Sequence, residues 1–314
     1  MTEIRATRAE STLAKTNAEG VRRKSLLRSI WKNRVLYLLL SPTIIGMIVF
    51  QYYPALTAFW GSFHSWDGRR ARFVGLFNYE FFLEDPRLLQ SWVNILLLLI
   101  FNVLSLSMPL LIAYLIYRLP NPTHRYWYRV LVVLPIIAPG FVFIVLWRWL
   151  FSLDGGINII LRSLGVDSQV VWLGNANTAL GSIMFMGFPW IDAFTVLIFL
   201  AGFIAIPTEM LDAAAVDGAS GWSRFFRIEL PQVQGQIKVL VILTFIGTVQ
   251  DFGRALFMTR GGPGYATMVP GLRMYNAFTQ ESAYGYASAI GVILFIVILV
   301  LTLINQRLIR SSES

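Results

Sequence analysis

Six stretches of this chain are long and apolar enough to cross the hydrocarbon core of a membrane as helices. Such a helix needs about 20 mostly apolar residues. Only 14% of the 314 residues are charged, whereas soluble domains carry about 25%. The sequence therefore predicts an all-α membrane protein with six transmembrane helices, at Tyr37–Phe63, Val93–Ile116, Val130–Leu150, Leu180–Ile206, Val239–Met258 and Ala287–Ile304.

The distribution of lysine and arginine sets the orientation. If the N-terminus is cytoplasmic, 17 of the 26 basic residues, including all four lysines, lie on the cytoplasmic side. Seven lie outside, and Arg148 and Arg254 fall within spans. Cytoplasmic loops carry the excess of Lys and Arg in membrane proteins. We therefore expect both termini in the cytoplasm, with a basic tail at 1–34, a six-span domain at 35–310 and a short tail at 311–314.

The net charge of +9 is explained by the basic residues that set the membrane orientation, so we expect no nucleic-acid partner. The tail 1–34 could lie on anionic lipid or serve only to set the topology. The chain has no cysteine and two histidines, which argues against disulfides, thiol catalysis and a metal site. It also lacks a G-x-x-x-x-G-K-[ST] phosphate loop. Gly261-Gly262-Pro263-Gly264 has no lysine after it and is expected to form a tight turn.

Residues 206–231 form a polar segment between the fourth and fifth apolar runs, on the predicted cytoplasmic side. Pro207 suits the first turn of a helix, and Asp217-Gly218 suits its end. Ser220 is expected to cap a second helix and Pro231 to stop it. The segment also carries apolar side chains that water alone would not cover. It could dock a soluble partner, or it could pack on the protein's own inner surface.

The spacing within this segment resembles the "EAA" loop of ABC-importer permease subunits. The pattern is present as Asp212-Ala213-Ala214, then Gly218, Ile228 and Leu230-Pro231, with Asp212 where the family usually has glutamate. Three further stretches resemble carbohydrate-type permeases, so that the resemblance covers about residues 36–310. They are Phe73-Val74-Gly75-Leu76-Phe77-Asn78-Tyr79, Thr259-Arg260-Gly261-Gly262-Pro263 with Thr267, and Gly285-Tyr286-Ala287-Ser288-Ala289.

The resemblance implies a permease subunit of a binding-protein-dependent importer, similar to the maltose-type and glycerol-3-phosphate-type subunits. It would form half of the pathway for a sugar, polyol or sugar phosphate, in a bacterial or archaeal cytoplasmic (inner) membrane. Its partners would be a second homologous permease, two cytoplasmic ABC ATPase subunits, an extracytoplasmic solute-binding protein and membrane lipid. ATP and magnesium would belong to the ATPase subunits, and this chain would have no cofactor and would not be an enzyme.

In that family the loop forms coupling helices that sit in a groove on the ATPase. The resemblance assigns this contact to one group of residues, in which the charged side chains orient it and the apolar ones pack it. They are Glu209, Leu211, Asp212, Ala213, Ala214, Asp217, Gly218, Ala219, Arg224, Phe225 and Phe226.

Polar residues inside the spans are candidates for the solute pathway, because burying them in hydrocarbon is costly. Asp192 and Trp190 follow Pro189 in the fourth run, and Gln250 and Asp251 interrupt the fifth. Asn94 and Asn102, eight residues apart in the second run, can face the same way.

Purely structural roles remain open at several of these positions. Arg254 lies three residues after Asp251, so the two could neutralise each other. Arg148 could snorkel to head groups or pair with Asp154. Pro135, Pro139 and Pro189 would permit kinks.

Two other classes of membrane protein have to be weighed against the permease. A self-contained secondary transporter or channel would usually be longer, with internal repeats and ion-coupling acids. A membrane enzyme would need clustered catalytic side chains, and the sequence shows none.

Overall fold

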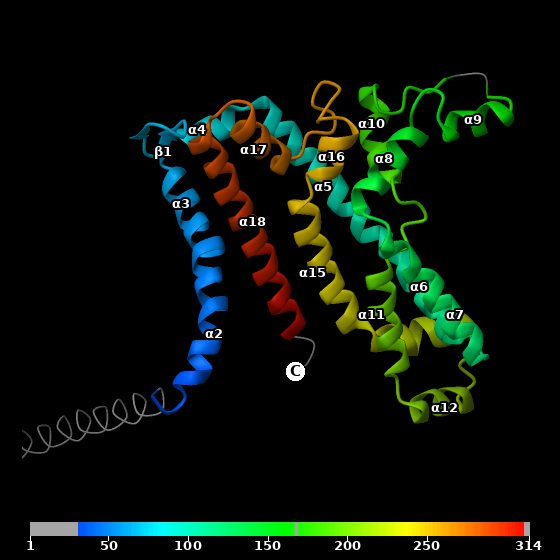
Figure 1. Ribbon diagram of the computed structural model, residues 1–314. Coiled ribbons are helices and arrows are strands. Elements are labelled where there is room, and N and C mark those ends of the chain that lie inside the picture. The colour runs from blue at the N-terminus through cyan, green and yellow to red at the C-terminus, as the bar shows by residue number, and fades with distance from the viewer. Residues whose placement is uncertain (1–30, 167–168, 311–314) are drawn as a thin grey trace, which may run out of the picture. The chain divides into compact units, whose positions relative to one another are not determined.

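The computed structural model describes residues 31–166 and 169–310, which are mostly helical (Figure 1). The tail predicted at 1–34 lies mainly outside the described residues, and the tail at 311–314 lies wholly outside them. The chain divides into two compact units, Met1–Thr57 and Ala58–Ser314, which are described separately.

The described part of the first unit is one helix that continues into the second unit. It consists of α2 (Arg34–Met47), the π-helical turn η1 (Ile48–Tyr52) and α3 (Tyr53–Gly61). The wide turn ends just before Pro54, where the Tyr53 N–H donates to the carbonyl five residues back, at Ile48. Proline lacks an N–H and its ring crowds the carbonyl four residues earlier, so widening the helix before it relieves the clash. No side chain of α2 or η1 is buried.

The second unit begins with a short hairpin, in which β1 (His64–Trp66) pairs antiparallel with β2 (Ala71–Phe73). Asp67 closes its turn by accepting hydrogen bonds from the backbone N–H groups of Arg70 (2.7 Å) and Arg69 (2.9 Å). These bonds favour the ionised form and hold the pKa of Asp67 below its ordinary value.

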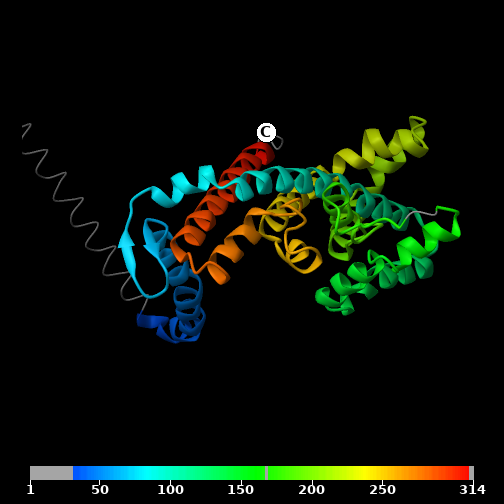
Figure 2. The ribbon, with the colours of Figure 1, turned by 90° about the horizontal axis from the view of Figure 1, so that it is seen from above.

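Two further predicted spans are confirmed as long helices. The second run lies in α5 (Pro86–Ser105) and α6 (Ser107–Arg118), which continue one another as a run of 33 residues (Figure 2). The sixth lies in α18 (Tyr284–Arg310). With Arg34–Gly61, these are the helices of the described chain that are each long and apolar enough to cross a membrane unbroken.

The third predicted span is wrong as a continuous helix. It consists of α7 (Pro122–Val133), a 3-10 turn η2 (Leu134–Ile137) and α8 (Gly140–Leu150). α7 and η2 together meet α8 at 87°. The bend falls at Pro139, which disfavours helical backbone at the residue before it. Ala138 is accordingly extended, with ψ 129°, so the predicted kink at Pro139 is confirmed. Pro135 lies within the 3-10 turn, before the bend.

The fourth and fifth predicted spans are also broken. The fourth divides into α10 (Ala176–Phe185) and α11 (Ala193–Ile204), around a non-helical stretch that contains Pro189. The fifth divides into α15 (Gln234–Gln250) and α16 (Gly253–Met258), where Asp251 takes extended backbone and its carboxylate turns to Arg254. The described chain has up to six spans if each of three other bent pairs counts as one. They are Pro122–Ile137 with Gly140–Leu150, Ala193–Ile204 with Thr208–Val216, and Gly221–Gln232 with Gln234–Gln250.

The remaining helices lie at the ends of these long elements. They are α4 (Phe77–Glu84), α9 (Gly156–Ser163), α12 (Thr208–Val216), α13 (Gly221–Arg224), the π-helical turn η3 (Phe225–Glu229), α14 (Leu230–Gln232) and α17 (Pro270–Thr279).

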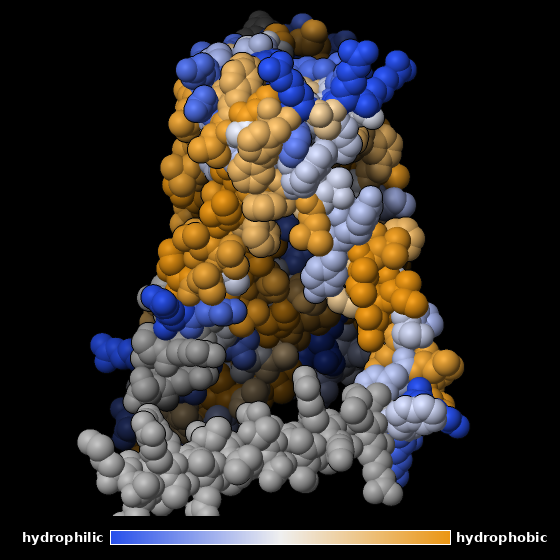
Figure 3. Space-filling view, turned by 90° about the vertical axis from the view of Figure 1, so that its left-hand side faces the viewer, coloured by the Kyte–Doolittle hydropathy of each residue, from blue (hydrophilic) through white to orange (hydrophobic). Residues whose placement is uncertain are grey.

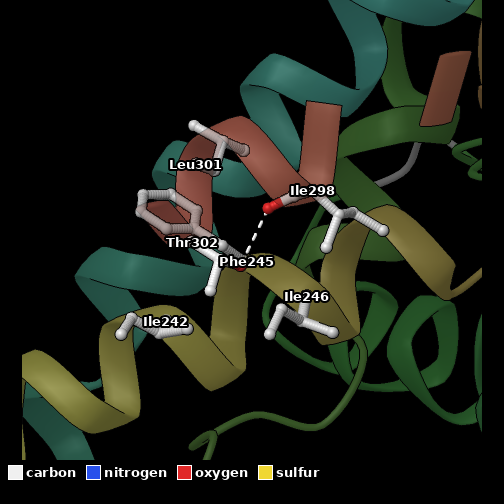
Figure 4. Close-up of a pocket in the computed structure, with 6 residues that line it drawn as sticks. All are labelled: Ile242, Phe245, Ile246, Ile298, Leu301 and Thr302. Atoms are coloured by element: carbon white, nitrogen blue, oxygen red, sulfur yellow. Dashed lines mark hydrogen bonds between the residues drawn. The ribbon is translucent and has the colours of Figure 1, made fainter. Parts of the chain in front are cut away.

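Three clusters of buried side chains hold the second unit together. One joins α5, α8, α10, α16 and α17, a second joins α6, α11 and the segment after α11, and a third joins α4, α5, α17 and α18. Large hydrophobic side chains also cover much of the exposed surface in Figure 3, as lipid contact requires. Figure 4 shows a small apolar gap between α15 and α18, where the Thr302 hydroxyl donates to the Ile298 carbonyl (2.8 Å). No ionisable group lines this gap, so we regard it as a packing gap.

Candidate functional site

Residues 207–233, here called the elbow, connect α11 to α15. In Figure 1 the elbow lies at the lower end of the second unit, while α4, α16 and α17 lie at the upper end. α12 meets α11 at 68°, and the helix Gly221–Gln232 meets α15 at 67°. The elbow therefore turns away from both apolar helices to which it is attached.

The first helix of the elbow follows the prediction from its sequence. α12 begins after Pro207 and ends before Asp217. Gly218 then takes φ +77°, a left-handed conformation that a side chain resists. The Ala219 N–H donates to the carbonyl of Ala214 (2.9 Å), which closes the helix end.

The second helix differs from its prediction at both ends. Ser220 stands at the N-cap position, but its side chain makes no capping hydrogen bond. Pro231 does not stop the helix, which continues to Gln232. The π-helical turn η3 directly before it explains this, because the Leu230 N–H donates five residues back, to the carbonyl of Phe225. The prediction assumed ordinary α-helical geometry, which this wide turn departs from.

One aromatic side chain ties the elbow to the helix bundle. Phe225 is 6% exposed, and its ring centre lies 4.4 Å from that of Tyr114 on α6 and 6.4 Å from that of Phe203 on α11. Leu211 and Leu230 pack against the same cluster. Burying a phenylalanine stabilises a fold by about 2–3 kcal/mol, so movement of the elbow would carry α6 and α11 with it.

A buried acid reinforces this attachment, and sequence analysis did not identify it. The Glu229 side chain is fully buried, and Arg224 donates to its Oε1 at 2.9 Å. Arg118 at the end of α6 lies 3.8 Å from the same oxygen. Glu229 Oε2 has no hydrogen-bond partner among the described residues. The sequence hint was weak, because Glu229 stands between two apolar residues in an otherwise charged segment.

The opposite face of the elbow is exposed and apolar. The exposed fractions are 88% for Val216, 64% for Trp222, 59% for Phe226 and 36% for Met210. The indole of Trp222 stacks on the ring of Phe226, with centres 5.9 Å apart. Exposed acids lie on α12 and at its end, and no described residue forms an ion pair with them. They are Glu209, Asp212 and Asp217.

The residues predicted for ATPase coupling thus divide by exposure. Ala214 and Phe225 are buried, while Leu211, Ala219 and Arg224 are half-buried. The remaining predicted residues are exposed: Glu209, Asp212, Ala213, Asp217, Gly218 and Phe226.

The candidate pathway residues of the fourth run lie at its break. Asp192, expected near the middle of a helix, instead caps α11, and its Oδ2 accepts from the backbone N–H (2.8 Å) and the hydroxyl (2.6 Å) of Thr195. Trp190 has φ +57° and donates its indole N–H to the Met184 carbonyl (3.0 Å). Its ring meets that of Phe101 edge-on at 5.3 Å.

The two candidate asparagines lie on α5 and contact different elements. Asn94 is buried, and its amide donates to the carbonyls of Met268 (2.8 Å) and Tyr265 (3.2 Å). Asn102 is half-buried and donates to the hydroxyl of Thr248 on α15 (2.9 Å). Asn94 therefore holds the loop before α17, while Asn102 faces α15.

The polar pair of the fifth run lies where α15 ends. Gln250 is exposed, and the Asp251 carboxylate is ion-paired with Arg254. The predicted neutralisation of these two charges is thus present. Thr248, Asp251 and Arg254 share a cavity of only about 10 Å³, the size of one water molecule.

At the upper end, a network of buried charges joins α5, α17 and α18. Arg273 donates to Asp85 Oδ2 at 2.7 Å, and both side chains are 1% exposed. Arg273 also makes two bonds to Glu281 (3.0 and 3.1 Å), and Tyr286 donates to Asp85 (3.0 Å). Burial alone would raise the pKa of Asp85, but the bond and charge of Arg273 outweigh it, and the pKa lies below its ordinary value.

Side chains from the other sequence motifs at this end, at 73–79, 259–267 and 285–289, hold neighbouring loops in place. Asn78 donates to the carbonyls of Ser62 and His64, both at 2.9 Å. Gly285 is needed beside them, because a Cβ there would fall 1.9 Å from the His64 oxygen. The hydroxyls of Thr259 and Thr267 lie 2.6 Å apart across the predicted tight turn at 261–264, which is confirmed. Arg148 donates to the Phe257 carbonyl (3.2 Å) and does not pair with Asp154, whose ion-pair partner is Arg162 (4.0 Å).

Comparison of the sequence with known families and proteins gives consistent matches. Residues 105–312 match a family described as "Binding-protein-dependent transport system inner membrane component". A probable ABC transporter permease protein, YesP of Bacillus subtilis, is 33% identical over 88% of this chain and 91% of its own length. The sulfoquinovosyl glycerol transport system permease protein SmoG of Agrobacterium fabrum is 28% identical over 97% and 99%.

The fold also matches solved structures. A chain of a bacterial ABC transporter involved in the import of the acidic polysaccharide alginate superposes with a TM-score of 0.81 at 24% identity. The match covers 91% of this chain and 98% of that one. At this identity the likeness establishes the fold.

Proposed function

Because this chain belongs to the family of binding-protein-dependent transport system inner membrane components, and is thus a permease subunit, we propose that its elbow is the contact with the ATPase that drives transport. On this proposal the elbow lies in the cytoplasm, both termini lie on the same side, and the chain crosses the membrane six times.

The exposed apolar face of the elbow carries the proposal. A monomeric surface rarely exposes contiguous large apolar side chains unless something binds there. Trp222 and Phe226 lie next to each other on this face, and aromatic residues of this kind dominate binding energy at interfaces. The acids Glu209, Asp212 and Asp217 have no ion-pair partner among the described residues, so a basic rim on the ATPase groove would complement them.

The attachment of the elbow supports a mechanical role. Phe225 and Glu229 hold the second elbow helix against α6 and α11, while Phe226 points to the outside. Closure of the ATPase dimer on ATP and magnesium would displace the elbow as a rigid body. The displacement would pass to the helices that line the pathway, as in other rigid-body transitions between packed elements.

The proposed assembly contains this chain, a second homologous permease, two ATPase subunits and a solute-binding protein. One solved relative is titled as an alginate ABC transporter in complex with an alginate pentasaccharide-bound periplasmic protein. A binding protein of that kind would approach the upper end, where α4, α16, α17 and the 259–267 loop lie.

We propose a carbohydrate or a related polyol or sugar phosphate as solute. Relatives are named for sulfoquinovosyl glycerol, trehalose and maltose, and sn-glycerol-3-phosphate. Of the candidate pathway residues, Asn102, Trp190, Gln250 and Asp251 surround the helix breaks at 186–192 and 251–252. Backbone that leaves helical geometry at membrane depth normally lines a cavity or is buried in protein.

The test is co-purification of the tagged chain from its native membrane in mild detergent. A soluble ABC ATPase should be recovered with the wild-type chain and should be lost when Trp222 and Phe226 are both changed to serine. A matched control changes two exposed lipid-facing residues, Leu38 and Phe50, to serine. Uptake of solute by the chain alone in ion-loaded vesicles, without any ATPase, would instead favour a secondary transporter.

A further inference from the structure

Two cavities flank the same short stretch at the upper end of the second unit. Their volumes are about 600 Å³ and about 640 Å³, and Arg148, Phe257 and Arg260 line both. Arg148 comes from α8 and Phe257 from α16, while Arg260 begins the tight turn after α16. Each cavity is large enough for several sugar rings or one small ligand with its water.

The charge of these cavities is positive and uncompensated. No acidic side chain lines either cavity, and neither Arg148 nor Arg260 forms an ion pair with any described residue. Arg87, Arg162 and Arg273 of the same end each have an acidic partner. Arg148 gives one donor to the Phe257 carbonyl (3.2 Å), and the other donors of the two guanidinium groups can bind an anion. Arginine suits carboxylate and phosphate groups because of its planar donor geometry.

The rest of the lining suits a saccharide. Trp172 is half-buried and lines one cavity with its ring, and Tyr275, Asn276 and Gln280 offer a ring, a hydroxyl and amides in the other. Ring faces cover the apolar side of a sugar, while amides and hydroxyls bond its hydroxyl groups. A third cavity of about 430 Å³ also contains Arg260 and extends to Arg87 and Arg273. Glu281 lines this third cavity and pairs with Arg87 and Arg273, so Arg260 is its one arginine without an ion pair among the described residues.

We propose that these cavities are an entry site for a saccharide that carries an anionic group, such as a carboxylate, sulfonate or phosphate. Arg148 and Arg260 bind the anionic group, and the aromatic and amide side chains bind the sugar. This inference rests on the proposed carbohydrate function and narrows its substrate class. A lipid phosphate has the same anionic chemistry, but it would leave the amide and hydroxyl lining of the second cavity without partners.

The experiment measures binding to the purified full chain in nanodiscs of phosphatidylcholine, with tryptophan fluorescence as the signal. The probes are trigalacturonate, its neutral counterpart maltotriose, and inorganic phosphate. Trigalacturonate should bind about tenfold more tightly than maltotriose. Its affinity should fall as salt rises, because exposed charges are screened.

Arg148→Gln and Arg260→Gln should each weaken trigalacturonate binding by about tenfold and leave maltotriose unchanged. Arg162→Gln is the matched control, since it removes an outer arginine that lines neither cavity and should change nothing. Thermal unfolding of each variant shows that the fold is intact.

Three results would overturn the inference. The first is equal affinity for the two trisaccharides, and the second is that neither trisaccharide binds. The third is that trigalacturonate binding is lost in nanodiscs that contain phosphatidylglycerol, which would assign the arginines to lipid. None of these results would affect co-purification of the ATPase, so the two experiments test the entry site and the ATPase contact separately.

Discussion

At each end of the second unit an acidic side chain is buried beside arginines, but the hydrogen bonds to its two carboxylate oxygens differ. At the upper end both oxygens of Asp85 are bonded, one to Arg87 and the other to Arg273 and Tyr286. In the elbow, Glu229 has one oxygen bonded to Arg224, and the other has no partner among the described residues. Both carboxylates have arginine partners, but both oxygens of Asp85 accept hydrogen bonds whereas only one oxygen of Glu229 does.

On the proposed function, this difference would separate a fixed end from a movable one. A fully satisfied buried network is rigid, whereas a partly satisfied one costs stability. Elements that move in transport come from the less stable parts of a structure. The upper end would hold the hairpin, α17 and α18 in place, and the elbow would shift when its partner moves.

The largest expected effect is at the fixed end. Arg273→Met leaves Asp85 buried without its main partner, which should lower the free energy of unfolding by about 3–5 kcal/mol. The measurement is denaturant unfolding of the detergent-purified chain. Arg87→Met is the control, because Arg87 is 31% exposed and its loss should cost about 1 kcal/mol or less. Equal losses in the two variants would contradict the proposed rigidity of this network.

The next effect concerns the two adjacent phenylalanines of the elbow. Phe226→Ala should leave the fold intact and weaken ATPase binding by about 2 kcal/mol, as expected for an aromatic anchor at an interface. Phe225→Ala should instead destabilise the chain, because Phe225 is buried against Tyr114. Binding to the immobilised ATPase and thermal unfolding, measured on both variants, distinguish the two roles. The docking face would be misassigned if Phe226→Ala bound the ATPase as well as the wild type.

A smaller effect is expected from Glu229→Gln. The amide keeps the shape but loses the charge facing Arg224 and Arg118. We expect a loss of about 1–2 kcal/mol in unfolding free energy, less than for Arg273→Met. The functional readout is the ratio of solute taken up to ATP hydrolysed in the assembled importer, which should fall while ATPase binding persists. An unchanged ratio would mean that Glu229 has only a structural role.

The smallest effect is a pH dependence. The pKa of Asp85 is lower in the folded chain than its ordinary value of 3.8. The stability that Asp85 contributes is therefore fully present above that value and is lost as the pH falls through the lower, folded-state pKa. Below about pH 4 the wild type should lose stability faster than Asp85→Asn does. Thermal unfolding between pH 6 and pH 3 tests this, and parallel curves would exclude Asp85 as the cause.

Sequence analysis identified much of the local structure. The first, second and sixth spans, the helix end at Gly218 and the bend at Pro139 follow from apolar length and from backbone chemistry, which are properties of neighbouring residues. The capping role of Asp192 was missed because the apolar run continues through the break at 186–192. Hydropathy counts side chains and does not register such a change in backbone direction.

What the sequence could not supply are the contacts between distant residues. Asp85 and Arg273 are 188 positions apart, and no local pattern links them. The cavities at Arg148 and Arg260 could not be predicted from the sequence either, because their lining comes from several elements that only the fold brings together. The burial of Glu229 also depends on Arg118, which lies on α6.

The wide turns at Ile48–Tyr52 and Phe225–Glu229 each end two residues before a proline. Each accommodates one residue more than a regular helical turn would. Shortening the second by a single residue would bring the proline back into conflict with its helix. It would also rotate everything N-terminal to it by about 100°, so that Trp222 would point inward. Length variation at this point should therefore be far more damaging than an insertion of similar size in the hairpin turn at 67–70.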